Sequence, residues 1–295
     1  MIIEHLQIEK GRSMNLDIRP LGTVMGAEVN GLDLNQPLDN ATKKSLYQGF
    51  LDHLLLCVRD QTIQDIAAFL NAARHFGSPK VQQLQGYRAT EFPEAGLVSS
   101  DDLDQSGDGK RIVRGTMFHT DESFIAVPPK ATILYAVEVP NQGGDTRFVN
   151  MQAAYDALDD NTKAKIDGLN AVHFYGKDRG SRKVPAMSAA ELKAAPPVSH
   201  PSVRAHDETR KKAIYVHETM TDYVDGLPPG ESESLLCHLY AHTTENPDFQ
   251  YRHQWRKGDF VIWDDRATLH AATADYDEDQ RRLLYRTMLA GTPTQ

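Results

Sequence analysis

Cysteine is scarce in this sequence. Only Cys57 and Cys237 occur in 295 residues, and they do not form a Cys-x-x-Cys pair. This scarcity excludes zinc-ribbon sites and dithiol redox motifs, both of which need paired thiols. Cys57 lies in an apolar run and Cys237 in a helical pattern. We therefore expect both thiols to be buried and reduced, as in a cytoplasmic protein.

Long apolar segments and a surplus of basic residues are also missing. No run approaches the roughly 20 apolar residues that cross a bilayer, and the first ten residues lack the basic start and apolar stretch of a secretion signal. The formal net charge of −9 disfavours a nucleic-acid-binding surface. The composition, 40% hydrophobic and 25% charged, is that of a globular chain. We expect a cytoplasmic protein with no membrane or nucleic-acid partner.

Strand patterns dominate the chain, and helix patterns flank them. Residues 1–14 are expected to form a leader and residues 15–295 a single domain, with lid-like insertions near 80–118 and 176–198, where periodicity is weak. Strands are expected at 15–34, 54–58, 131–139, 147–149, 172–175, 202–206, 212–216, 249–255, 259–263 and 282–290. Helices are expected at 40–51 after an Asp39 or Asn40 cap, at 63–75 after a Thr62 cap, and at 151–158, 161–169, 188–194 and 231–243. This order favours one antiparallel β core with helices packed outside.

A candidate metal site begins with His119-Thr120-Asp121. In extended backbone, residues two apart point to the same face, so the imidazole and the carboxylate can share one ion. His270 is the candidate third ligand, and only folding could bring it close. Two His and one carboxylate on one face of an ion, with open positions opposite, are typical of non-haem Fe(II) oxygenases. His-x-Asp alone is a common pattern, and surface or core histidines are its ordinary explanation.

Thr146 and Arg282 are candidates for holding an organic acid beside such an ion. A 2-oxo acid can chelate the open positions through its carboxylate and keto oxygen. A divalent ion, Asp121 and a dicarboxylic oxo acid leave one negative charge in excess, which is costly in a partly dry cavity. Arg282, on the expected last strand, can neutralise it, with the Thr146 hydroxyl beside it. Arg286, four residues further along that strand, can face the same cavity.

These residues belong to a longer set of motifs. The set comprises Phe118-His119-Thr120-Asp121-x-Ser123-Phe124, Pro128-Pro129, Gly143-Gly144-Asp145-Thr146, Trp263-Asp264-x-Arg266-x-x-x-His270 and Arg282-x-x-x-Arg286. In this order and spacing, the chain from about Asn15 to its end resembles the taurine and 2,4-dichlorophenoxyacetate dioxygenases, the TauD/TfdA family. The resemblance implies a mainly β fold with flanking helices, built on a distorted double-stranded β-helix (jelly-roll) core. It also suggests a homo-oligomer.

The resemblance assigns catalytic and cofactor roles by position. The iron ligands of the family fall on His119, Asp121 and His270. The residues that hold the distal carboxylate of 2-oxoglutarate fall on Thr146 and Arg282. The implied cofactors are Fe(II), 2-oxoglutarate as co-substrate, and O₂. Because the carboxylate ligand Asp121 is retained, a halogenase is disfavoured.

The substrate contacts are assigned in the same way. The Arg that holds the acidic group of the substrate falls on Arg286, whose alternative role is a structural ion pair. Gln82 stands at the place of a His that touches the sulfonate in the taurine enzyme, and its lack of charge disfavours taurine. Asp265 replaces the usual Asn, so its extra carboxylate is expected to affect the pairing of Arg266. The candidate apolar wall consists of Phe118, Phe124, Ile125 and Tyr175.

The implied activity is oxidative. It is the hydroxylation, with or without cleavage, of a small anionic substrate such as a sulfonate, an aryloxyalkanoate, an alkyl sulfate or an amino-acid derivative, with release of succinate and CO₂. Two alternatives stay open. A zinc hydrolase would use the same three ligands to activate water, and a non-catalytic β-barrel would bind a small ligand or sense metal.

Overall fold

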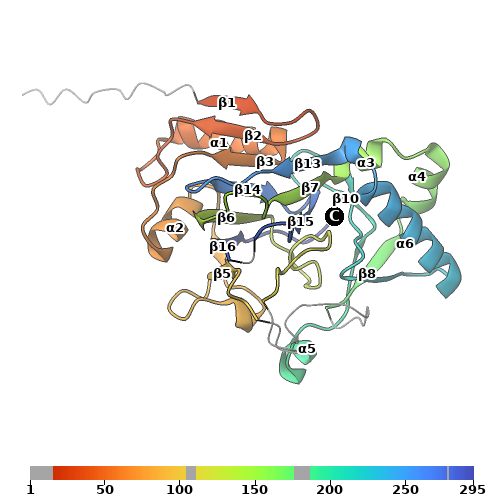
Figure 1. Ribbon diagram of the computed structural model, residues 1–295. Helices are drawn as coiled ribbons and strands as arrows, with labels where there is room; N and C mark the ends of the chain where they lie inside the picture. The colour runs from red at the N-terminus through yellow and green to blue at the C-terminus, as the bar shows by residue number, and fades with distance from the viewer. Residues whose placement is uncertain (1–15, 104–110, 176–186, 278) are drawn as a thin grey trace, which may run out of the picture.

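The computed structural model describes residues 16–103, 111–175, 187–277 and 279–295. Strands occupy the middle of the molecule, and helices lie around them (Figure 1). The expected leader and part of the second expected insertion lie outside the described residues. Within the described ranges, no helix is both long enough and apolar enough to cross a membrane.

The largest sheet has eight strands, with the path β1-β2-β3-β14-β6-β16-β4, and β5 also pairs with β16. Its strands are β1 Asp17–Pro20, β2 Ala27–Asn30, β3 Leu55–Val58, β4 Pro79–Lys80, β5 Ala95–Ser99, β6 Ala131–Glu138, β14 Phe260–Asp264 and β16 Leu283–Leu289. The pair β2–β3 is parallel, so the expectation of a wholly antiparallel core is wrong there. The strands β4 and β5 were also not predicted, because the segment 80–118 shows little periodicity.

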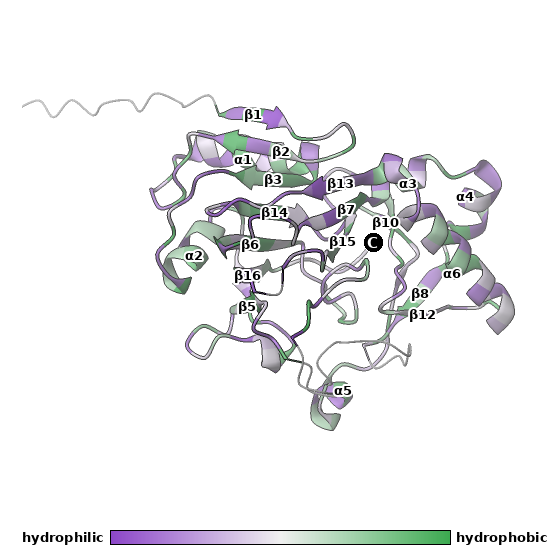
Figure 2. Ribbon diagram, in the orientation of Figure 1, coloured by the Kyte–Doolittle hydropathy of each residue, from purple (hydrophilic) through white to green (hydrophobic). Residues whose placement is uncertain are grey.

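The central strands of this sheet are buried on both faces. Every residue of β14 is buried, as are the first six residues of β6. Strands covered on both sides are continuously apolar instead of alternating, which is why both segments were predictable from sequence. Figure 2 shows the neighbouring strands β3 and β6 as hydrophobic and the edge strand β1 as hydrophilic.

Three smaller sheets complete the β structure. One has the order β13-β7-β15, with β7 Thr146–Asn150, β13 Gln250–His253 and β15 Thr268–Ala272. The next has the order β12-β8-β9, with β8 Asn170–His173, β9 Val198–Pro201 and β12 Thr221–Val224. The last is the pair β10 Val203–Ala205 and β11 Lys212–Ile214. The antiparallel pair β10–β11 confirms the expected hairpin. The strand β15, which carries His270, was not predicted as a strand.

Caps were predicted for two helices, and one of the two predictions is confirmed. Asp39 caps α1 by accepting a hydrogen bond from the Thr42 backbone N–H (2.7 Å). The second helix is capped by Asp65, which accepts from Ala68 N–H, and the Thr62 prediction is wrong because the helix starts later. The helices are α1 Asn40–His53, α2 Ile66–Ala73, α3 Met151–Asp156, α4 Asp160–Ile166, α5 Ala189–Ala194 and α6 Pro229–Thr244, with short 3-10 turns η1 Gln85–Tyr87 and η2 Pro247–Phe249.

Candidate active site

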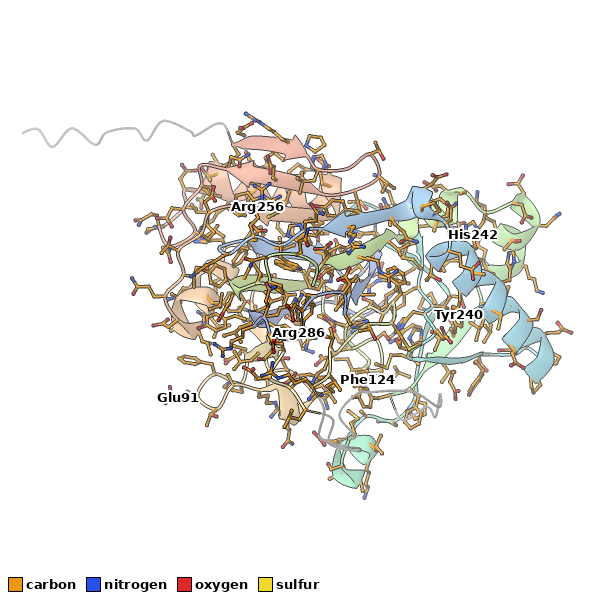
Figure 3. The ribbon with its side chains drawn as sticks, in the orientation of Figure 1. Glu91, Phe124, Tyr240, His242, Arg256 and Arg286 are labelled. Atoms are coloured by element: carbon orange, nitrogen blue, oxygen red, sulfur yellow. The ribbon has the colours of Figure 1, made fainter. Side chains whose placement is uncertain are left out.

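A cavity of about 610 Å³ is lined by residues of the largest sheet and of the β13-β7-β15 sheet. The main sheet contributes Val98, Leu134, Trp263 and Arg286, and the β13-β7-β15 sheet contributes Thr146, His270 and Ala272. The first expected insertion forms much of the remaining wall through residues 82–87 and 111–117. Figure 3 shows two of the lining residues, Arg286 and Phe124, on the same side of the stacked strands.

His119, Asp121 and His270 converge in this cavity. Their ligand atoms all lie within 4.8 Å of one another. The Nε2 atoms of His119 and His270 are each 3.9 Å from an oxygen of Asp121, too far for a hydrogen bond. The two histidines meet because His119 and His270 exchange backbone hydrogen bonds of 3.0 and 2.8 Å. His119 has extended backbone at this bridge, whereas Asp121 begins a turn.

The charge states of Asp121 and His270 suit a divalent metal. Arg286 Nη2 donates to Asp121 Oδ1 (2.6 Å), and Thr132 Oγ1 lies 2.7 Å from Asp121 Oδ2. Burial raises the pKa of Asp121, but Arg286 and the two histidines outweigh it and hold that pKa below its ordinary value. Burial and His119 hold the pKa of His270 well below its ordinary value. A carboxylate and neutral imidazoles are the forms that bind metals.

The tautomer of His119 follows from its contact with the backbone. Its Nδ1 lies 2.8 Å from the Met117 carbonyl oxygen. A carbonyl only accepts hydrogen bonds, so Nδ1 carries a proton, and in the neutral imidazole the lone pair is then on Nε2, the nitrogen that lies 3.9 Å from Asp121. His270 Nδ1 is buried and has no hydrogen-bond partner among the described residues. The arrangement therefore presents two imidazole nitrogens and a carboxylate around one point.

Arg282 is a buried cation that lacks a carboxylate partner within the described part of the chain. Its Nε donates to the Gly144 carbonyl oxygen (2.9 Å), and burial lowers its pKa to about 10. It lies one residue before β16, not on the strand as predicted. Thr146, the first residue of β7, lines the same cavity, and its Oγ1 accepts from Trp255 Nε1 (3.0 Å). The Thr146 hydroxyl proton is thus available to a further acceptor, so the pair can bind an anion.

The Gly143-Gly144 turn brings the backbone against this pair. Both glycines have positive φ, +75° and +66°. A Cβ at Gly143 would lie 2.3 Å from the Asp275 carbonyl oxygen, and one at Gly144 would lie 3.2 Å from Arg282 Cδ. Glycine is needed for both the conformation and the close approach. This turn therefore holds the Arg282 side chain against the cavity wall.

Arg286 and Gln82 lie together in the cavity. Arg286 Nη1 donates to Gln82 Oε1 (3.1 Å), while the Gln82 Nε2 group is buried without a hydrogen-bond partner among the described residues. Arg286 forms an ion pair with Asp121, as its alternative role proposed, and it also lines the cavity. Phe124 and Tyr175 line the cavity as expected, but Phe118 and Ile125 are not lining residues. Phe118 instead packs its ring against the Arg147 guanidinium.

Several lining residues were missed in the sequence. The ring centroid of Tyr87 lies 5.3 Å from the guanidinium carbon of Arg114 and 5.9 Å from that of Arg286. Arg114 is itself paired with Asp102 (2.6 Å). These contacts involve the first insertion, where the lack of periodicity gave no basis for placing side chains. Thr132, whose hydroxyl contacts Asp121, was missed as well, although its polarity within the buried strand β6 was a signal for a polar contact.

Two expectations about side-chain pairing are corrected. Arg266 binds Asp264, Asp207 and Glu208, and Asp265 takes no part in that network. The two cysteines differ: Cys57 is buried, as expected, whereas Cys237 is exposed on α6. The helical pattern around Cys237 did not show which face of α6 packs against the rest of the chain, so its exposure could not be predicted.

A second group of possible metal ligands lies outside the cavity lining. Cys57, His253 and Asp259 are all buried, with ligand atoms within 4.8 Å of one another. Burial and the neighbouring Asp259 raise the pKa of Cys57 well above its ordinary value. Arg59 Nη1 already neutralises Asp259 at 2.7 Å. We call this group the closed cluster, and the group of His119, Asp121 and His270 the open cluster.

Comparison with known proteins identifies the family. A profile described as "Taurine catabolism dioxygenase TauD, TfdA family" matches residues 17–288. The chain belongs to the TauD/TfdA family. A TauD/TfdA relative, the (S)-phenoxypropionate/alpha-ketoglutarate-dioxygenase of Sphingobium herbicidovorans, is 34% identical, covering 94% of this chain and 96% of the relative. An alkylsulfatase of Acinetobacter baylyi is 30% identical over 96% of this chain and 87% of its own length.

Solved structures agree with this assignment. The crystal structure of AAD-2 in complex with Mn(II) and N-oxalylglycine superposes with a TM-score of 0.79 at 32% identity. The alignment covers 96% of this chain and 100% of that one. The fold is therefore that of its TauD-like neighbours: mainly β, with flanking helices.

Proposed function

We propose that this TauD/TfdA enzyme uses Fe(II), 2-oxoglutarate and O₂ to hydroxylate a small monoanionic substrate with an apolar body. The observation that carries the proposal is one cavity lined by the open cluster, by Thr146 and Arg282, and by Arg286. A zinc hydrolase would use the three ligands but would leave the buried cation of Arg282 without a function. When bound, iron and 2-oxoglutarate supply the oxidising chemistry, with release of succinate and CO₂.

The contacts of the lining residues support a role for each of them. His119, Asp121 and His270 hold the iron, and Arg286 and Thr132 keep the Asp121 carboxylate ionised and oriented. Arg282 and Thr146 hold the distal carboxylate of 2-oxoglutarate, which relieves the cost of burying the Arg282 cation. Arg286 and the unpartnered Gln82 amide group hold the acidic group of the substrate.

Formal charge favours a monoanion as substrate. Fe(II), Asp121 and doubly charged 2-oxoglutarate sum to one negative charge, and Arg282 and Arg286 turn that sum into one positive charge. The other charged lining residues are neutralised locally, Arg114 by Asp102 and Glu122 by Lys80, while Arg111 lies half-exposed towards solvent. One negative charge on the substrate balances the cavity. A zwitterion such as taurine would leave a buried positive charge uncompensated.

An apolar group of lining residues favours an apolar substrate body. It consists of Leu84, Phe124, Tyr175 and Met220, and Phe124 and Tyr175 meet edge to face with ring centroids 4.9 Å apart. An alkyl or aryl group gains roughly 25 cal/mol for each Å² removed from water against such a wall. Aryloxyalkanoates and alkyl sulfates combine that body with one charge, so we rank them above amino-acid derivatives.

The proposal extends to the architecture around the site. The main sheet and the β13-β7-β15 sheet flank the cavity, which supports a distorted jelly-roll core. The profile match over residues 17–288 supports a single catalytic domain for 15–295. The segment 80–118 supplies part of the cavity wall, which supports its role as a lid. Only residues 187–198 of the second proposed lid are described, and Met187 there packs with Phe124 and Tyr175.

The test is succinate formation from 2-oxoglutarate with a panel of anions. The panel contains phenoxyacetate, phenoxypropionate, a medium-chain alkyl sulfate, an alkanesulfonate and taurine. We expect stimulation by one monoanion class and little by taurine. Arg286→Ala should abolish the stimulation, whereas Arg281→Ala, a half-exposed arginine nearby, should not. Stimulation by taurine alone, or activity with zinc and no O₂, would contradict the proposal.

A further inference from the structure

Asp265 is a buried carboxyl group beside the open cluster, and it has no ion-pair partner among the described residues. It is 1% exposed. Trp263 Nε1 donates to its Oδ1 (3.0 Å), and its Oδ2 lies 2.7 Å from Thr132 Oγ1. The family resemblance leads us to expect Asn at this position, whereas this chain has Asp.

Thr132 connects Asp265 to the open cluster. Its Oγ1 lies 2.7 Å from Asp265 Oδ2 and 2.7 Å from Asp121 Oδ2. Both distances are in the range of O–H···O hydrogen bonds. A threonine hydroxyl carries one proton, so it can donate to only one of the two oxygens. If both aspartates were ionised, the carboxylate oxygen that receives no proton would lie 2.7 Å from a lone pair of Thr132 Oγ1. Such a contact between two lone pairs is unfavourable in a buried site.

One of the two carboxyl groups must therefore supply a second proton. Asp121 accepts from Arg286 at 2.6 Å, and the proposed iron needs it as a carboxylate. Asp265 has its Oδ1 occupied by the Trp263 donor, which leaves Oδ2 for the proton. Burial and then the charge of Asp121 raise the pKa of Asp265 well above its ordinary value, in agreement with the count of protons.

We propose that Asp265 is a neutral carboxylic acid that donates to Thr132 and thereby positions the Asp121 ligand. The relay runs from Asp265 Oδ2–H to Thr132 Oγ1, and from Thr132 Oγ1–H to Asp121 Oδ2. In this relay Asp265 Oδ2 donates, Thr132 Oγ1 both accepts and donates, and Asp121 Oδ2 accepts, so no two lone pairs face each other. Asn at this position would donate through its amide group in the same direction, so the two side chains are equivalent only if Asp265 is protonated.

The inference rests on the proposed role of Asp121 as a metal ligand, and the experiment separates the two. Infrared difference spectra of wild-type protein against Asp265→Asn, both free of metal, should show the C=O stretch of a buried, protonated carboxyl group. Mn(II) affinity is then measured by calorimetry at pH 7. Asp265→Asn should bind within about threefold of wild type, whereas Asp265→Ala and Thr132→Val should bind roughly 10–100-fold more weakly, the range for groups that orient metal ligands.

A matched control excludes a general effect of losing a buried hydroxyl. Thr287→Val removes a fully buried threonine hydroxyl that donates to the Glu94 carbonyl oxygen, away from the open cluster, and should keep wild-type Mn(II) affinity. Absence of the protonated-carboxyl band, or equal loss of affinity in Asp265→Asn and Asp265→Ala, would overturn the inference. A wild-type protein that binds no Mn(II) would instead overturn the proposed function, while the infrared result would still stand.

Discussion

The open and closed clusters contain similar residues and do different work. Each combines histidine with an aspartate, and each aspartate contacts an arginine, Arg286 at 2.6 Å or Arg59 at 2.7 Å. In the closed cluster, His253 Nε2 bonds Asp259 at 3.2 Å and its Nδ1 bonds the Tyr251 hydroxyl at 3.2 Å. Both ring nitrogens are therefore used. In the open cluster, the corresponding histidine–aspartate distances are 3.9 Å.

The difference between the two clusters shows that suitable ligand types lying close together are not sufficient for a metal site. A metal needs lone pairs that point to one place and a route for the ion and its other ligands. In the closed cluster, both His253 ring nitrogens and Asp259 Oδ2 are engaged in hydrogen bonds, and only Asp259 Oδ1 lacks a partner among the described residues. Burial and Asp259 also favour the protonated form of the Cys57 thiol by raising its pKa. The open cluster borders the cavity and keeps a gap between its groups. We therefore expect one bound metal ion per chain.

The largest expected effect removes a ligand of the open cluster. His270→Ala should lower metal affinity and succinate formation by more than 100-fold, beyond the roughly 10–100-fold typical of groups that only orient ligands. Metal content after dialysis against Fe(II) and a coupled succinate assay measure both. The comparison variant His253→Ala should still bind one ion per chain. Loss of metal from His253→Ala with retention in His270→Ala would reverse the assignment.

Removing the arginine of the closed cluster should cost stability instead of activity. Arg59→Met leaves the buried Asp259 carboxylate without its ion pair, and breaking a buried pair costs roughly 3–5 kcal/mol. Urea denaturation should show that loss of unfolding free energy, with metal stoichiometry unchanged at the temperature where the variant is folded. A loss below about 1 kcal/mol would mean that the closed cluster is not charge-balanced in the way described.

Arg282 should show the opposite behaviour. Arg282→Met removes a charge-assisted contact to 2-oxoglutarate worth roughly 1.5–3 kcal/mol, so the KM for 2-oxoglutarate should rise roughly ten- to a hundredfold. Unfolding free energy without ligand should stay the same or rise, because the buried cation lacks a carboxylate partner in the described structure. An unchanged KM would remove Arg282 from the 2-oxoglutarate site.

The smallest effect is a pH dependence of stability from His253. Burial lowers its pKa below the ordinary 6.5, so the unfolded chain takes up a proton that the folded chain refuses. Stability is full above about pH 6.5 and falls below it, by at most about 1.4 kcal/mol per pH unit. Denaturation of wild type and His253→Gln at pH 7 and pH 5 should show a smaller fall in the variant. Equal slopes would mean that His253 is protonated in the folded protein.

Local signals predicted the elements that depend on neighbouring residues. The Asp39 cap of α1 and the buried run of β14 are such cases. The Thr62 cap failed because Asp65, three residues later, offers a competing carboxylate. The wall prediction failed for Phe118, since the direction of an isolated aromatic side chain depends on what packs beside it. Tyr87 and Arg114 could not be placed because their segment has no period from which to infer a face.

The sequence by itself determined the chemical inventory of the site: which imidazoles, carboxylates and guanidinium groups exist, and their order along the chain. Only the tertiary structure decided which of them meet and which retain usable lone pairs. The backbone bridge between His119 and His270 forms the open cluster. The pairing of β14 with β3 draws Cys57 towards Asp259. Strand register between distant segments sets these distances, and a local pattern contains no information about that register.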